Sequence, residues 1–156
     1  MFATPNALRT LLAAGLLSVA TFGPALAADD ELTMFKDPNC GCCGKWAEHM
    51  RANGFSVKEV ATREMDTVKR EAGVPQALAS CHTAKVGGYI VEGHVPAADV
   101  KRMLAQKPAI TGLSAPGMPL GSPGMETPQG HKEPYDTLLV LRSGATRVFA
   151  RHNPPA

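Results

Sequence analysis

Three of the four cysteines in this 156-residue chain lie within four positions, at Cys40, Cys42 and Cys43. The fourth, Cys81, is followed directly by His82. Thiolates are soft metal ligands and strong nucleophiles, so a cluster this dense indicates either soft-metal binding or thiol–disulfide chemistry. The four cysteines are therefore candidate ligands, and His82 is a candidate imidazole ligand beside them.

Cys40 and Cys43 have the Cys-x-x-Cys spacing of thiol oxidoreductases, and we expect them at the N-terminus of a helix. Unpaired backbone N–H groups and the helix dipole favour a thiolate there. Cys42 favours a metal cluster, because a third thiol in the same loop could form incorrect disulfides with a redox pair. Two structural disulfides, Cys40–Cys43 and Cys42–Cys81, are a third interpretation. Zn²⁺ accepts the same four thiolates as a copper ion, and spacing alone does not decide among these alternatives.

The histidines differ in what their positions predict. Neighbouring side chains of a strand point to opposite faces, so Cys81 and His82 reach one ion only if the chain bends there. His94, at the end of a predicted strand, is either a second imidazole ligand or part of a turn. His49 lies about 10 Å along the predicted helix from Cys42, so we expect it at the surface. Two further histidines carry no functional signal; they are His131 and His152.

Two methionines occur in the same Pro-Gly-Met frame, seven residues apart, at Met118 and Met125. Thioether sulfur suits Cu(I). Methionine also fills irregular gaps in protein cores, which is its commoner use. The surrounding segment, 112–130, is rich in proline and glycine, and we expect it to form no regular structure. Both methionines are candidate copper ligands or shields of the cysteine cluster.

The first 27 residues have the pattern of an export signal. Arg9 precedes an apolar run, and Ala25-Leu26-Ala27 supplies the small residues that signal peptidase accepts. The apolar run is too short to span a bilayer. We therefore expect cleavage after Ala27, a mature domain over 28–156, a periplasmic location and no membrane span.

Charge and length narrow the classes of function. The formal net charge is only +2, which gives no reason to invoke nucleic acid or an anionic membrane surface as a partner. A single domain of this size can bury an adequate core without disulfides. Export exposes cysteines to an oxidising environment, so four of them in such a chain require a chemical explanation.

Hydrophobic periodicity and turn residues predict the elements that position the cysteines. The order is strand, helix, strand, helix, strand, strand, helix, which is typical of a thioredoxin-like α/β fold. A hairpin over 135–150 is expected to join the sheet or pack beside it. The predicted core elements are strand 32–35, helix 42–53, strand 55–60, helix 62–72, strands 81–86 and 89–92, and helix 97–106.

Several long motifs together resemble the CopG family of periplasmic copper resistance proteins. They are DPNCGCCGKW (37–46), GVP (73–75), SCHTA (80–84), VEGHVP (91–96) and GMPLGSPGME (117–126). The resemblance covers 32–126 and implies a thioredoxin-like fold with copper on its cysteines. The family's Cys-x-Cys-Cys and Cys-His motifs correspond to Cys40, Cys42, Cys43, Cys81 and His82. The family's proposed role is copper handling or interconversion of Cu(I) and Cu(II).

The sequence therefore predicts an exported copper-binding protein of copper resistance or homeostasis. Its cluster would hold Cu(I) as one ion or as a multinuclear site, and copper oxidoreductase activity is one form this function could take. The alternatives are a periplasmic thiol–disulfide oxidoreductase that uses Cys40 and Cys43, and a passive copper store or shuttle. Copper ions and other periplasmic copper-handling proteins are the expected partners.

Overall fold

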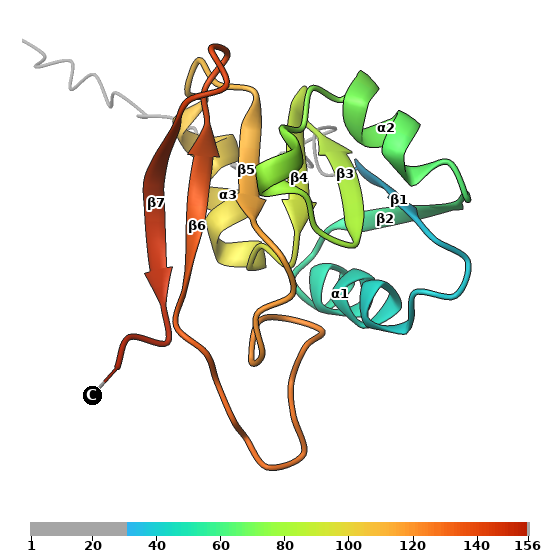
Figure 1. Ribbon diagram of the computed structural model, residues 1–156, viewed down its shortest axis with the longest axis vertical. Coiled ribbons are helices and arrows are strands. Elements are labelled where there is room, and N and C mark those ends of the chain that lie inside the picture. Colours follow the sequence, from blue (N-terminus) through green and yellow to red (C-terminus); the bar gives the residue numbers. More distant parts are fainter. Residues whose placement is uncertain (1–30, 156) are drawn as a thin grey trace, which may run out of the picture.

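The computed structural model describes residues 31–155, so the signal peptide expected over 1–27 lies outside the described residues. Seven strands form one mixed sheet in the order β2-β1-β3-β4-β5-β6-β7 (Figure 1). No helix in the described part is both long and apolar enough to cross a membrane. The strands are β1 (Glu31–Lys36), β2 (Ser56–Ala61), β3 (His82–Val86), β4 (Tyr89–Gly93), β5 (Gly112–Ala115), β6 (Tyr135–Val140) and β7 (Thr146–His152). The helices are α1 (Gly41–Ala52), α2 (Met65–Glu71), the short 3-10 helix η1 (Gln76–Leu78) and α3 (Ala97–Gln106).

The expected order of elements from β1 to α3 is confirmed, with η1 added before β3. β1 pairs in parallel with β2 and antiparallel with β3. The β3–β4 hairpin turns at Gly87 and Gly88, which both have positive φ, as a tight two-residue turn requires. α2 begins at Met65, later than expected, because Thr62 accepts a hydrogen bond from the Glu64 N–H and forms a turn instead of the first helical residues.

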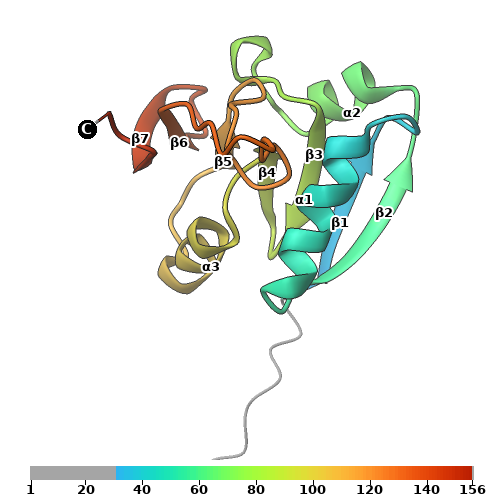
Figure 2. The same ribbon diagram turned by 90° about the horizontal axis from the view of Figure 1, so that it is seen from below.

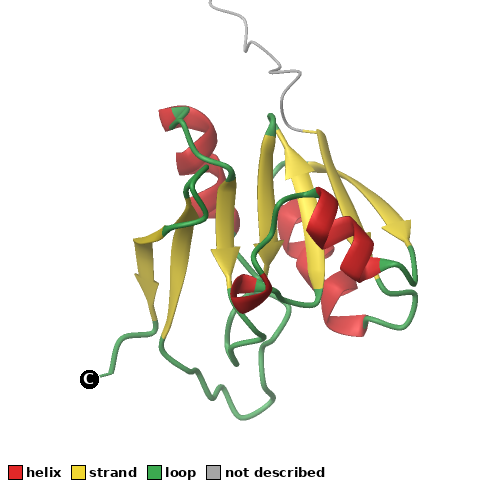
Figure 3. Cartoon of the chain, turned by 45° about the horizontal axis from the view of Figure 1, so that its top comes forward, coloured by secondary structure: helices red, strands yellow, loops and turns green. Residues whose placement is uncertain are grey.

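The expectation that 112–130 forms no regular structure is wrong for its first four residues. Gly112–Ala115 is β5, a fully buried strand that pairs in parallel with β4. Because both its faces are buried, the strand shows no alternation of polar and apolar residues that would have revealed it. β6 then pairs antiparallel with β5, and β7 pairs antiparallel with β6, so the predicted hairpin is part of the sheet and continues to His152. The remaining loop to β6 is irregular (Figure 3).

Helices cover both faces of the sheet (Figure 2). α1 and α3 lie on one face, where the His49 side chain of α1 accepts a hydrogen bond from the Ala97 N–H of α3. α2 lies on the other face, and its Lys69 contacts side chains of β3 and β4. The buried side of α1 follows the helical period, as predicted. That side consists of Cys43, Trp46, Ala47 and Met50.

Candidate metal centre

The first cysteines lie at the start of α1, as the sequence predicted. Cys40 occupies the N-cap position and α1 begins at Gly41. Asn39 donates its N–H to Asp37 Oδ1 at 2.8 Å in the turn that precedes the helix. Cys40 and Cys43 form a disulfide across the first turn of the helix.

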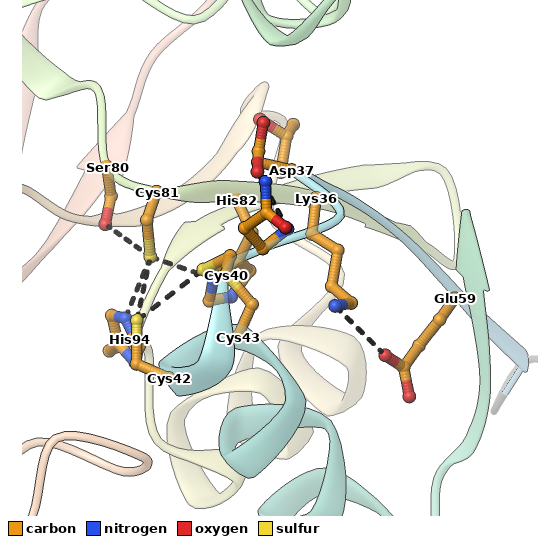
Figure 4. Close-up of a disulfide and its surroundings, with 12 residues drawn as sticks. Lys36, Asp37, Cys40, Cys42, Cys43, Glu59, Ser80, Cys81, His82 and His94 are labelled. Carbon is orange, nitrogen blue, oxygen red and sulfur yellow. Dashed lines mark hydrogen bonds and ion pairs between the residues drawn. A yellow bond between two sulfur atoms is a disulfide. The ribbon is translucent and has the colours of Figure 1, made fainter. Parts of the chain in front are cut away.

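The other two cysteines are free and lie beside this disulfide (Figure 4). Cys42 Sγ is 3.6 Å from Cys40 Sγ and 3.9 Å from Cys81 Sγ, although 39 positions separate Cys42 and Cys81 in the sequence. The four sulfur atoms all lie within 4.8 Å of one another. The fold thus brings the Cys-x-Cys-Cys and Cys-His motifs to one place.

Two imidazoles extend the cluster through Cys81. Its Sγ atom lies 3.4 Å from His82 Nδ1 and 3.0 Å from His94 Nε2. Donor atoms of these three residues lie within 4.8 Å of one another and form a second potential ligand group that shares Cys81 with the four-sulfur group. The chain bends at Cys81, because β3 begins only at His82. This bend lets two consecutive residues reach the same site.

A backbone carbonyl on the side away from Cys81 fixes the orientation of the His94 ring. Its Nδ1 atom lies 2.8 Å from the Pro123 carbonyl oxygen, which can only accept, so Nδ1 carries the proton. The Nε2 lone pair therefore faces the cluster, as in metal sites where a carbonyl sets the tautomer of a histidine ligand. Burial lowers the pKa of His94, which favours the neutral form that a metal ion requires.

His82 is fully buried between Trp46 and His94. Burial lowers the pKa of His82 well below its usual range, and the charges of His94 and Lys69 act in the same direction. Its Nε2 atom has no hydrogen-bond partner among the described residues. A buried imidazole held neutral, with its Nδ1 atom beside Cys81 Sγ, is chemically suited to a metal ion at that sulfur.

Without a cation the Cys81 thiol stays protonated. Burial raises its pKa to about 12, and the neighbouring Cys42 contributes to the rise. A soft metal ion would reverse this preference, because a coordinated thiol loses its proton. The site therefore does not stabilise the Cys81 thiolate on its own and can stabilise it through a bound ion.

The loop between β5 and β6 covers the start of α1. A Cβ atom on Gly124 would lie 2.8 Å from the Cys42 carbonyl oxygen, and the φ of Gly124 is +85°, so only glycine fits this approach. Gly117 accepts a hydrogen bond from the Ser80 hydroxyl, one residue before Cys81. The loop is thus attached at both sides of the cluster.

The two methionines of this loop differ in exposure. The Met118 side chain is 53% exposed. Met125 is half-buried, and its backbone bonds Ser122 and Gly121 within the loop. The loop therefore reaches the cluster, and both methionines stay candidate ligands or shields at its edge.

Three other histidines lie outside the cluster. His49 is not the surface residue that we expected: it is half-buried, and burial lowers its pKa. His152, which carried no signal, lies 2.8 Å from the buried carboxylate of Asp99. His131 is exposed. Sequence reasoning also missed Glu92, whose only signal was a charge inside an otherwise apolar strand.

Comparisons with known proteins agree with this geometry. A family model described as "Protein of unknown function, DUF411" matches residues 78–125. Two solved structures, both of "Copper resistance protein copG" (Form 2 and Form 1), are 41% identical in sequence with a TM-score of 0.74. They cover 78% of this chain, which in turn covers 97% and 96% of theirs. No curated protein matches. The chain therefore belongs to the CopG (DUF411) family of copper resistance proteins.

Proposed function

We propose that this protein binds Cu(I) in copper resistance, with Cys40, Cys42, Cys43 and Cys81 as thiolate ligands. His82 and His94 complete the site as imidazole ligands. The observation that carries the proposal is the convergence of four sulfur atoms and two neutral imidazoles around Cys81. Met118 and Met125 act at the rim of this site, on the loop that covers it.

The donor set favours copper or zinc over harder ions. Thiolate and imidazole together suit Cu(I) and Zn²⁺, whereas carboxylate and water suit harder ions. No carboxylate belongs to either ligand group among residues 31–155. The copG name of the solved relatives supports copper rather than zinc.

The Cys40–Cys43 disulfide makes copper loading dependent on redox state. In the oxidised form, Cys42 and Cys81 are the remaining thiols, beside the two imidazoles. Two-electron reduction of the disulfide releases two further thiols at the same place. We therefore expect the reduced protein to bind more Cu(I) than the oxidised protein.

Anaerobic titration with Cu(I) tests this function directly. The mature protein is loaded in its oxidised and its fully reduced form, and thiols that remain reactive are counted before and after. We expect copper to protect all four thiols of the reduced form. In a parallel experiment we expect Cu(I) to displace Zn²⁺ that was bound first. A reduced protein whose thiols stay reactive at saturating Cu(I) would contradict the proposal.

A thiol–disulfide oxidoreductase is the second candidate, and the Cys40–Cys43 disulfide at the N-terminus of α1 favours it. A passive copper store or shuttle is a third reading of the same site. The double variant Cys42→Ser, Cys81→Ser keeps only the redox pair. We expect it to reduce insulin slowly and to have lost tight copper binding. Rapid catalytic turnover of insulin by this variant would establish the oxidoreductase instead.

We also propose a cellular and structural setting for this function. Residues 1–27 direct export to the periplasm, where other copper-handling proteins would be its partners. β1 to α3 form a thioredoxin-like core, supported by the mixed order β2-β1-β3-β4 with only β1 and β2 parallel among the four. Fractionation of cells that express the full chain should recover a shortened protein from the periplasm.

A further inference from the structure

A buried carboxylate lies behind the segment that carries Cys81, on the α2 face of the sheet. Glu92 of β4 is only 1% exposed. Its Oε1 atom accepts hydrogen bonds from the Ser80 backbone N–H at 2.7 Å and from Lys69 Nζ at 2.5 Å. Its Oε2 atom accepts one from the Thr83 hydroxyl at 2.6 Å. Three donors from three parts of the chain thus converge on one carboxylate.

Two of these donors flank the Cys–His pair, since Ser80 precedes Cys81 and Thr83 follows His82. In a regular strand Cys81 and Thr83 would share a face, and His82 would point to the other. Thr83 and His82 obey this rule, with Thr83 on the α2 face and His82 packed against α1. Cys81 departs from it, because its Sγ atom lies 3.4 Å from the His82 ring.

We propose that Glu92 is a positioning residue of the metal centre. Its carboxylate holds the backbone N–H of Ser80 and the hydroxyl of Thr83, and so fixes the bend that turns Cys81 to the His82 side of the sheet. Lys69 supports this by compensating the buried charge, which would otherwise be strongly unfavourable. The inference rests on the proposed copper site.

Two double variants separate the hydrogen bonds from the charges. Lys69→Met with Glu92→Leu removes both and keeps similar side-chain volumes. Lys69→Met with Glu92→Gln removes the charges and keeps the hydrogen bonds. The amide oxygen of the introduced glutamine can still accept from the Ser80 N–H, and its amide N–H can donate to the Thr83 hydroxyl. The matched control is Thr137→Val, which removes a fully buried, hydrogen-bonded hydroxyl from β6.

The first measurement needs no copper. Diamide oxidises the Cys42 and Cys81 thiols to a disulfide, taking up two electrons and two protons, and mass spectrometry follows this bond over time. A small misplacement of reacting atoms strongly slows such a step, so we expect the Leu variant to react at least about 10-fold more slowly. The Gln variant and Thr137→Val should stay within about twofold of the wild type, because both keep the bend.

The second measurement is the Cu(I) affinity of the reduced proteins, in competition with a chromophoric Cu(I) chelator. We expect the Leu variant to bind about 10- to 100-fold more weakly, as for other residues that orient metal ligands. The Gln variant should match the wild type. Thr137→Val should lose melting temperature but keep its copper affinity, which separates positioning from general stability.

Two results would overturn the proposal: a Leu variant with wild-type disulfide rate, or a Gln variant as impaired as the Leu variant. If the wild type bound no Cu(I), the proposed function would fail, while the diamide rates would still decide the role of Glu92. If the Leu variant did not fold, Thr83→Val would decide, because it removes one of the three donors. A slower diamide reaction in Thr83→Val would support the role, and an unchanged rate would refute it.

Discussion

Two polar clusters with histidines lie in different halves of the sheet, and they differ in how their hydrogen bonds balance. In the C-terminal half, Asp99 Oδ2 accepts from the Thr137 hydroxyl at 2.8 Å and lies 2.8 Å from His152 Nε2. Asp99 also lies in the first turn of α3, where a carboxylate interacts favourably with the helix dipole. We name these residues the Asp99 cluster. Its carboxylate acceptor is matched by donors within the cluster and needs no further partner.

The candidate metal centre has the opposite balance. His94 Nε2 offers a lone pair toward Cys81 Sγ, His82 Nδ1 lies 3.4 Å from the same sulfur, and the Cys42 and Cys81 thiols are weak donors. These groups have no strong donor among them, so a cation held at Cys81 would serve acceptors that hydrogen bonds satisfy poorly. The comparison teaches that a histidine beside matched donors and acceptors indicates structure. Surplus lone pairs around a histidine indicate a ligand site.

The largest effect should come from removing a sulfur of the metal centre. We expect Cys81→Ser and Cys42→Ser each to weaken Cu(I) binding by more than about 100-fold, beyond the effect of residues that only orient ligands. Chelator competition on the reduced proteins measures this. Thr137→Val, in the Asp99 cluster, should keep its Cu(I) affinity. Full copper loading in Cys81→Ser would refute the convergence of the two motifs on one site.

The converse experiment truncates the Asp99 cluster. Asp99→Ala leaves Thr137 and His152 without their acceptor, and we expect a loss of about 2 to 3 kcal/mol in the free energy of unfolding. Urea unfolding of the metal-free protein measures it. Arg151→Ala, at a 78% exposed side chain 4.0 Å from Asp136, should cost less than about 0.5 kcal/mol. A large fall in Cu(I) affinity in Asp99→Ala would show that the two clusters are coupled.

Alkaline pH should lower the stability of the metal-free protein through the Cys81 thiol, and we expect this effect to be smaller than the two above. The folded-state pKa of Cys81 is raised from 9.0 to about 12, so its contribution to stability is complete below pH 9 and is lost as the pH rises toward 12. We expect the metal-free wild type to lose more stability than Cys81→Ser between pH 8 and pH 11, as followed by urea unfolding. Burial also raises the pKa of Tyr135, but this group is present in both proteins and cancels in the comparison. Parallel stability curves for the two proteins would contradict the expected Cys81 contribution.

The smallest effect should come from the methionines at the rim. Thioethers need no deprotonation, so Met118→Ala with Met125→Ala should weaken Cu(I) retention several-fold, and more at pH 5 than at pH 7. Chelator competition at both pH values measures this. Because Met118 is 53% exposed, its truncation should cost little stability. Equal losses of melting temperature with and without copper, at unchanged affinity, would assign both methionines to packing.

The sequence predicted the elements whose signal is local. Helical period identified α1, whose buried side includes Trp46 and Met50, and turn residues identified the β3–β4 hairpin, which turns at Gly87 and Gly88. Cys40 and Cys43 are one helical turn apart, so their proximity follows from spacing. The motifs of the family then indicated that Cys81 joins them, which spacing across 39 positions could not establish.

What the sequence did not reveal depends on partners distant in the chain. β5 is buried on both faces and shows no strand period. Glu92 is recognisable only once Lys69, 23 positions away, and the Ser80 N–H are seen to meet it. His152 is similar, since its partner Asp99 is 53 positions distant. The Pro123 carbonyl that orients His94 is a backbone group, which no side-chain pattern can mark.

The covering loop is inserted between two strands that pair with each other. β5 and β6 are antiparallel neighbours, and their register is fixed by Leu113 opposite Leu139 rather than by the residues of the loop. The sheet therefore does not depend on the loop for its register, as antibody loops are carried by a constant framework. The loop is nevertheless restricted where it meets the cluster, at Gly124 against the Cys42 carbonyl oxygen and at the Pro123 carbonyl oxygen that orients His94. A change in this segment would alter the surroundings of the cluster and leave the framework of α1, β3 and β4 in place.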